Sequence, residues 1–277
     1  MKLSFATLSC PTWTLEQIIE AGVQHGYDGI EFRGLLHEID LANTAEFSPA
    51  GIGATRGKLE QAGLAAACLS SSVHVVNSVK TEVDRRADIA HAKRYVDMAK
   101  EVGAPYVRIF CGEAPAEMPR SVALDKAADS LREIGDFAAE RAVIVVVETH
   151  DAFVRSELLM EVIRLANHSA VQVLWDIHHP YRIAGESMAH TLRYLDGHVR
   201  HTHVKDSVLH PDTEGYTYVL LGDGDIPYRE ALGGLKGLGY DGYLSLEWEK
   251  RWIPALAEPE VVIPHYAATM RGWLAEM

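Results

Sequence analysis

The sequence predicts an α/β protein that folds as a single (β/α)8 TIM barrel over residues 1–277. Eight short apolar runs alternate along the chain with eight stretches of helical periodicity, and this alternation is typical of a parallel sheet. The length of 277 residues is close to the size at which such a barrel folds as one unit. No low-complexity linker divides the sequence, so one closed barrel is favoured over two domains.

Each expected element has a local signal in the sequence. Thr14 has the side chain of an N-cap, and apolar residues recur after it at helical spacing. The stretch 207–226 predicts a long polar loop, whose LGDGDIP segment lacks the lysine of a phosphate-binding loop and is assigned to a turn. The expected strands are 2–7, 30–32, 64–70, 105–110, 143–151, 171–176, 199–203 and 242–246, and the expected helices are 14–23, 49–61, 82–102, 119–140, 157–167, 187–195, 227–238 and 259–273.

Composition excludes several classes of protein. Hydrophobic residues make up 48% of the chain, which is enough for a large core and excludes global disorder. The formal net charge of −13 disfavours binding to a phosphate backbone, which requires a basic face. The three cysteines form no CxxC pair, and no apolar run has the length of a signal peptide core or a membrane span. These features predict reduced thiols in a cytoplasmic protein.

Four of the expected strands end in a side chain suited to metal binding or acid–base chemistry. VIVVV runs into Glu148, VQVLW ends in Asp176, the strand from Val199 delivers His203, and GYLSL ends in Glu247. Such apolar runs predict strands that are buried on both faces and end where charge reaches solvent. In a parallel barrel these ends converge on the carboxyl-terminal rim, where active sites of this fold lie. We therefore expect these four residues to form the active site.

Motifs along nearly the whole chain resemble one known family. DGIEFR, VVVETHD, WDIHHP, HTHVKD, LGDGDIP and GYDGYLSLEWEKRW are similar to motifs of the sugar phosphate isomerase/epimerase family of xylose-isomerase-like TIM barrels, which also contains inosose dehydratases, ketose 3-epimerases and endonuclease IV. The resemblance implies that Glu148, Asp176, His203 and Glu247 are the ligands of one divalent metal ion. Three carboxylates and one imidazole make a mostly hard-oxygen site, for which Mn²⁺ is favoured and Mg²⁺, Co²⁺ or Zn²⁺ are alternatives.

Further residues near the strand ends are candidates for substrate binding. His179, three residues after Asp176, matches the substrate-side histidine of the family and is preferred over its neighbour His178. Lys205 is expected either to hold a substrate oxygen and stabilise negative charge there, or to form an ion pair with Asp206. The other candidates for orienting a polar ligand are His74, Arg108, His150, Glu31, Arg33 and Glu113. For His150, a structural role agrees equally well with the sequence. His201 is expected either to support His203 as a hydrogen-bond partner or to pack in the barrel interior.

The resemblance and the ligand set together imply an isomerase or epimerase that acts on a keto sugar, a sugar phosphate or a related polyol. The metal ion would acidify the C–H bond of an α-hydroxy ketone and stabilise an enediolate. Glu148 and Glu247 would act as catalytic base and acid on the two faces of that carbon. Loss of a β-hydroxyl from the same intermediate would instead make the protein a dehydratase or lyase of an inosose or keto-glycoside. A non-catalytic sugar-binding barrel is the third alternative.

The sequence departs from endonuclease IV where that relative has its extra metal ligands. A DRH triplet precedes LGEG in endonuclease IV, whereas Tyr216, Thr217 and Tyr218 precede LGDG in this chain. Together with the acidic net charge, this predicts one metal ion per chain and no action on nucleic acid. The expected partner is a small carbohydrate, no membrane association is expected, and a homo-oligomer is compatible with the sequence.

Overall fold

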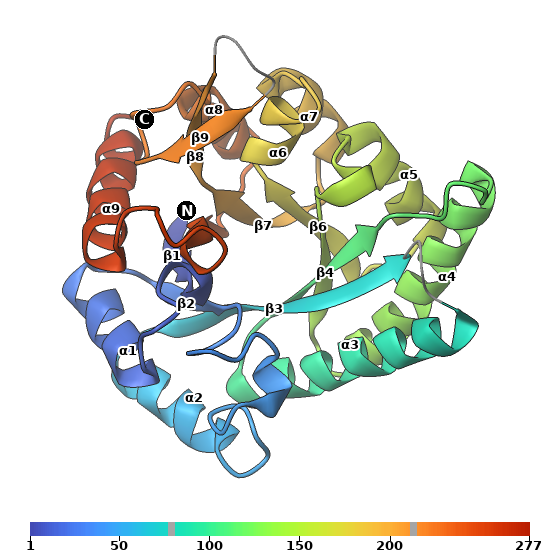
Figure 1. The fold of residues 1–277 in the computed structure, drawn as a ribbon, viewed down its shortest axis with the longest axis horizontal. Helices are drawn as coiled ribbons and strands as arrows, with labels where there is room; N and C mark the ends of the chain where they lie inside the picture. Colours follow the sequence, from blue (N-terminus) through green and yellow to red (C-terminus); the bar gives the residue numbers. More distant parts are fainter. Residues whose placement is uncertain (77–80, 211–214) are drawn as a thin grey trace.

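The computed structural model describes residues 1–76, 81–210 and 215–277, and it shows a closed barrel of parallel strands surrounded by helices (Figure 1). The strand order around the barrel is β1-β10-β7-β6-β5-β4-β3-β2, so strands that follow one another in the chain lie side by side. The one exception in this order is β10, which follows β7 because a two-stranded hairpin of β8 and β9 is inserted between them. The predicted (β/α)8 barrel is confirmed.

The barrel strands begin and end close to the predicted positions, with β3 as the main exception. Pairing of β3 with β4 continues past residue 70, after a shift in register between Ser70 and His74. The strand therefore carries His74 to the rim as part of the sheet. The bounds are β1 Lys2–Ala6, β2 Gly29–Phe32, β3 Ala65–Val76, β4 Tyr106–Gly112, β5 Ile144–Glu148, β6 Val171–Asp176, β7 Val199–Val204 and β10 Tyr243–Leu246.

The expected helices are all present in the described residues, and one short helix was missed. Thr14 caps the first helix as predicted, since its hydroxyl accepts from the Gln17 amide at 3.4 Å and the Gln17 side chain accepts from the Thr14 amide at 2.9 Å. The missed helix, α6, follows directly after Asp176. The bounds are α1 Leu15–Gln24, α2 Ile52–Gln61, α3 Glu82–Val102, α4 Arg120–Ala139, α5 Ser156–Ala166, α6 His178–Arg182, α7 Met188–Leu195, α8 Tyr228–Gly237 and α9 Pro259–Ala275.

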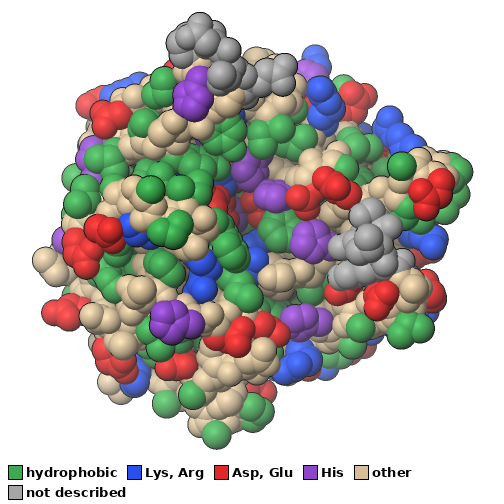
Figure 2. All heavy atoms as spheres, in the orientation of Figure 1, with side chains coloured by type: hydrophobic (Ala, Val, Ile, Leu, Met, Phe, Trp, Pro, Cys, Tyr) green, Lys and Arg blue, Asp and Glu red, His purple; other side chains and the backbone are tan. Residues whose placement is uncertain are grey.

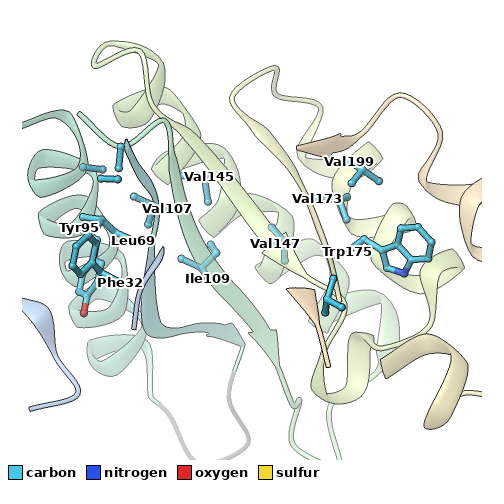
Figure 3. Packing of buried hydrophobic residues seen from close by; sticks show 14 of the residues in the cluster. Phe32, Leu69, Tyr95, Val107, Ile109, Val145, Val147, Val173, Trp175 and Val199 are labelled. Atoms are coloured by element: carbon cyan, nitrogen blue, oxygen red, sulfur yellow. The ribbon is translucent and has the colours of Figure 1, made fainter. Parts of the chain in front are cut away.

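Side chains of the barrel strands alternate between the helix layer and the barrel interior. Val145 and Val147 of β5 belong to the large core cluster between the strands and the helices (Figure 3). Val146 instead packs with Cys68 and Leu174 in a separate small cluster. Because successive strand residues face opposite sides, the same alternation that sends Val145 and Val147 outward turns the even-numbered residues of β5 and β6 toward the barrel interior.

An antiparallel hairpin lies where the sequence predicted only a polar loop. Strand β8, Asp206–Leu209, pairs with β9, Tyr216–Val219. The prediction of a loop over 207–226 is therefore wrong for these two segments, while residues 211–214 lie outside the described residues. The LGDGDIP segment forms the turn before α8, as predicted. No helix in the described parts of the chain is long and apolar enough to cross a membrane.

Candidate active site at the carboxyl end of the barrel

The four residues predicted at strand ends lie together in the barrel. Glu148 and Asp176 are the last residues of β5 and β6, His203 lies near the end of β7, and Glu247 follows β10 directly. One ligand-type atom from each lies within 4.8 Å of the others, and all four residues are buried. Parallel strands bring their carboxyl ends to one rim, so residues distant in sequence meet at this point.

Neighbouring backbone groups hold the Asp176 carboxylate in place. Its Oδ1 accepts hydrogen bonds from the amides of His178 and His179, at 2.9 and 3.0 Å, at the first residues of α6. Asp176 also pairs in register with His203 on the adjacent strand. The helix that the sequence analysis missed therefore positions one of the predicted metal ligands.

A buried carboxylate lies behind the histidine of the site. Glu31, on β2, accepts hydrogen bonds at Oε1 from His203 Nε2 at 2.8 Å and from Ser70 Oγ at 2.5 Å. Its Oε2 accepts from His201 Nε2 at 2.7 Å and from Ser245 Oγ at 2.7 Å. Glu31 has no exposed surface. The expectation that Glu31 orients a ligand is therefore wrong, because all its acceptor positions are occupied by protein donors.

Glu31 fixes which nitrogen of His203 faces the site. Because an ionised carboxylate only accepts hydrogen bonds, His203 Nε2 must carry a proton. Burial alone would raise the pKa of Glu31, but the charges of His203 and His201 hold it well below its usual range. His203 Nδ1 lies 3.2 Å from an oxygen of Glu148 and 3.2 Å from an oxygen of Glu247. Nδ1 is therefore the nitrogen available as a ligand.

Lys205 lies inside the site and does not pair with Asp206. Its Nζ is 2.6 Å from Asp176 Oδ2 and 3.2 Å from Glu249 Oε1, and it also contacts Glu247 Oε2. Burial alone would lower the pKa of Lys205, but the charges of these carboxylates, with Asp176 the largest, raise it well above its usual value. The lysine is therefore an ammonium ion that donates into the carboxylate cluster.

Asp206 has a different task, because it anchors the LGDGDIP turn. Its carboxylate accepts hydrogen bonds from the amides of Gly222 at 2.9 Å, Gly224 at 3.2 Å and Ser207 at 2.9 Å. A Cβ atom on Gly224 would lie 2.0 Å from Asp206 Oδ1, so only glycine allows this approach. The alternative in which Asp206 neutralises Lys205 is thus wrong.

The candidate substrate-binding histidines line one side of the site. Figure 2 shows histidine, acidic and basic side chains gathered in the central hollow of this face. His179 Nδ1 lies 3.2 Å from Asp176 Oδ2, and its ring centroid is 4.8 Å from that of His150. Asp151 joins His150 and His74, since its two oxygens lie 2.6 Å from His150 Nδ1 and 3.5 Å from His74 Nε2. Asp151 thereby orients His150 with Nε2 left for another partner.

Two arginines complete the interior of the site. Arg108, on β4, is 1% exposed, and its Nε lies 3.4 Å from Glu148 Oε2. Arg33 directly follows β2 and is 8% exposed. Burial and the charge of Arg108 lower the pKa of Arg33 to about 10. Arg33 therefore remains cationic at neutral pH.

The structure also places His178 and Glu113, two further residues named from the sequence. His178, the neighbour of His179, donates to or accepts from Ser207 Oγ at 2.8 Å and packs on the rings of Tyr216 and Tyr218, as a structural histidine would. Glu113 is exposed beyond the end of β4.

Glu249 is a site residue that the sequence analysis missed. It reaches Lys205 from two positions after Glu247. The EWE spacing places both carboxylates on one side of the extended chain and is the signal that could have found it.

The donor set fits a divalent metal ion. Three carboxylates and one imidazole nitrogen are hard or borderline donors, and no thiol belongs to the group. Glu148 Oε2 is buried and accepts no hydrogen bond from the described residues, which suits an oxygen that awaits a ligand from outside the chain. His179 also lies in two further groups of close donors, with Asp176 and His178 and with Glu148 and His150.

This barrel and its carboxylate–histidine centre define a recognisable class of protein. The model of the xylose isomerase-like TIM barrel family matches residues 19–273, and the chain belongs to this family. The crystal structure of IOLI protein with a binding zinc atom shares the fold, with a TM-score of 0.83 and 20% sequence identity over 100% of this chain and 99% of that chain.

Two curated relatives within the family catalyse different reactions. Fructoselysine 3-epimerase of Shigella flexneri is 26% identical over 168 residues, which cover 59% of this chain and 59% of that protein. Inosose dehydratase of Geobacillus thermodenitrificans is 27% identical over 164 residues, which cover 53% of this chain and 52% of that protein. The chain thus matches little more than half the length of either relative. Epimerases and dehydratases are similar to it to the same degree.

Proposed function

We propose that this chain is a divalent-metal-dependent isomerase or epimerase that acts on a keto sugar or a related polyol. The observation that carries the proposal is the convergence of Glu148, Asp176, His203 and Glu247 within 4.8 Å, buried beside a charged lysine. These four residues would hold the metal ion, with His203 using Nδ1. Mn²⁺ is the favoured ion, because oxygen donors dominate the set.

The reaction we propose is movement of a proton on a carbon next to a carbonyl group. A bound divalent ion would supply Lewis-acid stabilisation of the negative charge that develops on the substrate oxygens. Glu148 and Glu247 would take and return the proton on the two faces of the carbon. Burial alone would raise the pKa of both carboxyls, but in the absence of a metal ion it is lowered overall, mainly by the charge of His203. A bound divalent cation, to which His203 would be a neutral ligand, would favour the ionised carboxylates in the same way. Both are therefore ionised and able to accept a proton.

The remaining polar residues would bind and orient the substrate. Lys205 would donate to a substrate oxygen on which negative charge develops. His150 is held by Asp151, and this hydrogen bond is the main force that raises its pKa against the effect of burial. It would donate to a hydroxyl group. Burial holds the pKa of His179 well below its usual range, so His179 is neutral and would accept or donate one hydrogen bond. His74 and Arg108 would complete the binding surface.

Solvent exchange in D₂O tests this proposal. The protein loaded with Mn²⁺ is incubated with a panel of keto sugars, and the recovered substrate and product are analysed by NMR. We expect deuterium at the carbon next to the carbonyl, and no exchange after the metal is removed with a chelator. Turnover without deuterium incorporation would contradict a proton-transfer mechanism open to solvent. A His203→Ala variant that retains full metal occupancy by elemental analysis would contradict the ligand assignment.

Dehydration is the second candidate reaction, favoured by the 27% identity to an inosose dehydratase. The same carboxylates would remove the proton, and a charged donor such as Lys205 or His150 would protonate the departing hydroxyl group. Mass spectrometry separates the two reactions, because a dehydratase releases one molecule of water from the substrate and an epimerase leaves its mass unchanged. Absence of any tightly bound divalent metal ion in the purified protein would instead favour a non-catalytic sugar-binding barrel.

A further inference from the structure

Two buried guanidinium groups in the barrel make no hydrogen bond to any described residue. Arg33 Nη1, Arg108 Nε and Arg108 Nη1 are shut off from solvent and lack a hydrogen-bond partner among those residues. Guanidinium nitrogens are donors only, and leaving such a donor unpaired in the interior destabilises the fold. A fold keeps such groups without partners mainly where a ligand will supply acceptors.

The two arginines lie at one level of the barrel, on either side of β3. Phe32 of β2 pairs with Leu69, and Ser70 pairs with Arg108 of β4. Arg33 is the residue after Phe32 and therefore lies at the level of Ser70 and Arg108. The closeness of the two cations also appears in the lowered pKa of Arg33, to which Arg108 contributes after burial.

No carboxylate among the described residues fully neutralises the charges of Arg33 and Arg108. Arg33 has no carboxylate oxygen within 4.0 Å in the described residues, and Arg108 has only the 3.4 Å contact with Glu148. Glu148 is itself engaged by His203 at 3.2 Å. Two adjacent like charges in a buried place repel each other, and an anion between them would relieve both the repulsion and the missing hydrogen bonds.

The backbone presents Arg33 in a fixed position. Thr7 Oγ1 accepts from the Arg33 amide at 2.9 Å and donates to the carbonyl of Gly34 at 2.6 Å. Gly34 has a φ of +74°, and a Cβ there would lie 2.7 Å from the Glu38 carbonyl oxygen. The guanidinium of Arg108 is likewise placed, with its carbon 3.9 Å from the ring centroid of Phe110. The backbone of Arg33 and the guanidinium of Arg108 are therefore held in place before a ligand arrives.

We propose that Arg33 and Arg108 form an oxyanion subsite, so that the substrate carries a carboxylate or phosphate group in addition to its α-hydroxy ketone. This inference rests on the proposed function for the identity of the reacting end, and it adds the chemical class of the substrate. Guanidinium groups match the paired oxygens of carboxylate and phosphate, whereas the hydroxyl groups of a neutral sugar pair with them more weakly. The Arg108–Glu148 contact places the subsite next to the metal ligands.

Matched ligand pairs test the subsite by calorimetry on the full-length protein loaded with Mn²⁺. L-Sorbose and 5-keto-D-gluconate differ in a carboxylate, and D-fructose and D-fructose 6-phosphate differ in a phosphate. We expect the anionic member of at least one pair to bind roughly tenfold to a hundredfold more tightly than its neutral partner. The pair that shows the preference identifies the anion.

Variants then assign the preference to the two arginines. Arg33→Met and Arg108→Met should each remove most of the preference, while Arg33→Lys keeps the charge without the planar fork and should keep part of it. Arg94→Met, on the exposed surface of α3, is the matched control and should behave like the parent protein. Manganese content and circular dichroism of each variant separate a lost subsite from a lost metal site or fold.

Equal binding within both ligand pairs, or an anion preference that survives in both methionine variants, would overturn the subsite. The proposed function fails by a different result, because it requires metal-dependent exchange of the α-hydrogen with D₂O. Exchange on neutral sugars without any anion preference would keep the reaction and reject the subsite. Anion preference that depends on the arginines, with no exchange on any ligand, would keep the subsite and reject the proposed reaction.

Discussion

Replacing Glu31 with glutamine should weaken metal binding without a direct change at any proposed ligand. Glu31 accepts four hydrogen bonds, two from histidines and two from serines. An amide accepts at only one of its two ends, so one histidine must move its proton from Nε2 to Nδ1 or lose its partner. If that histidine is His203, the proton appears on the nitrogen that faces Glu148 and Glu247.

The expected loss of metal affinity follows from the changed hydrogen-bond partner of His203. Partners that orient a metal-binding histidine typically contribute a factor of roughly 10 to 100 in metal affinity, which corresponds to about 1.4–2.8 kcal/mol. The Glu31 side chain is fully buried and faces donors on both oxygens. The amide can turn its NH₂ group toward His201 instead, and His203 then loses only the charge of its partner. This orientation sets the lower end of the range.

Competition of Mn²⁺ between the protein and a fluorescent chelator measures the effect, and ¹⁵N NMR of the imidazole nitrogens reports the tautomer of His203. Glu60→Gln, on the exposed face of α2, is the matched control, since among the described residues its carboxylate pairs only with Arg56 at the surface. Ser245→Ala removes one donor but keeps the charge of Glu31, so its effect should be smaller. A dissociation constant for Glu31→Gln within twofold of the parent, with an unchanged fold, would refute the reasoning.

Three further predictions concern pH, thiols and the glycine turn. Burial lowers the pKa of His178 to about 2. Below the unfolded pKa of about 6.5, therefore, only the unfolded chain takes up a proton at this residue. The free energy of unfolding should fall as the pH decreases, and His178 should contribute about 1.4 kcal/mol per pH unit to this fall. Urea unfolding of His178→Gln between pH 7 and pH 5 should show a shallower decline, and equal slopes would contradict the prediction. The three cysteines are buried, and burial raises their pKa. A colourimetric thiol reagent at pH 8 should therefore react with none of them in the native protein and with all three in guanidinium. Rapid labelling of the native protein would contradict this prediction. Gly224→Ala places a methyl group against the Asp206 carboxylate and should destabilise the protein by about 1–3 kcal/mol in thermal unfolding, a result that an unchanged melting temperature would exclude.

The barrel and the quartet at its rim could be predicted from sequence because both depend on local patterns. Apolar runs of strand length mark each strand, and the residue that ends the run marks the rim. Once the strands are parallel and closed, Glu148, Asp176, His203 and Glu247 must meet, without any knowledge of side-chain geometry. Their roles as ligands and catalytic groups remain predictions that the experiments above address.

The interactions behind and beside the quartet could not be predicted in the same way. Glu31 and His203 are 172 residues apart, and nothing local in DGIEFR distinguishes a carboxylate that faces a ligand from one that supports a histidine. An ion pair with the neighbouring Asp206 was one of the two roles expected for Lys205, but adjacent residues in an extended segment face opposite sides. Lys205 therefore faces the site, and Asp206 faces the turn. The hairpin of β8 and β9 was missed because its strands are short and their polar residues resemble a loop.

The distribution of charge around the barrel interior constrains how the proposed substrate lies. The carboxylates at the ends of β5, β6 and β10 occupy one side, and Arg33, directly after β2, and Arg108, within β4, occupy the other. An anionic group placed among the carboxylates would be repelled, whereas the same group beside the two arginines would gain charge-assisted hydrogen bonds. A substrate with a hydroxy ketone at one end and an oxyanion at the other therefore has one favourable orientation. Its ketone faces Glu148 and Glu247, and its anionic group lies beside Arg33 and Arg108.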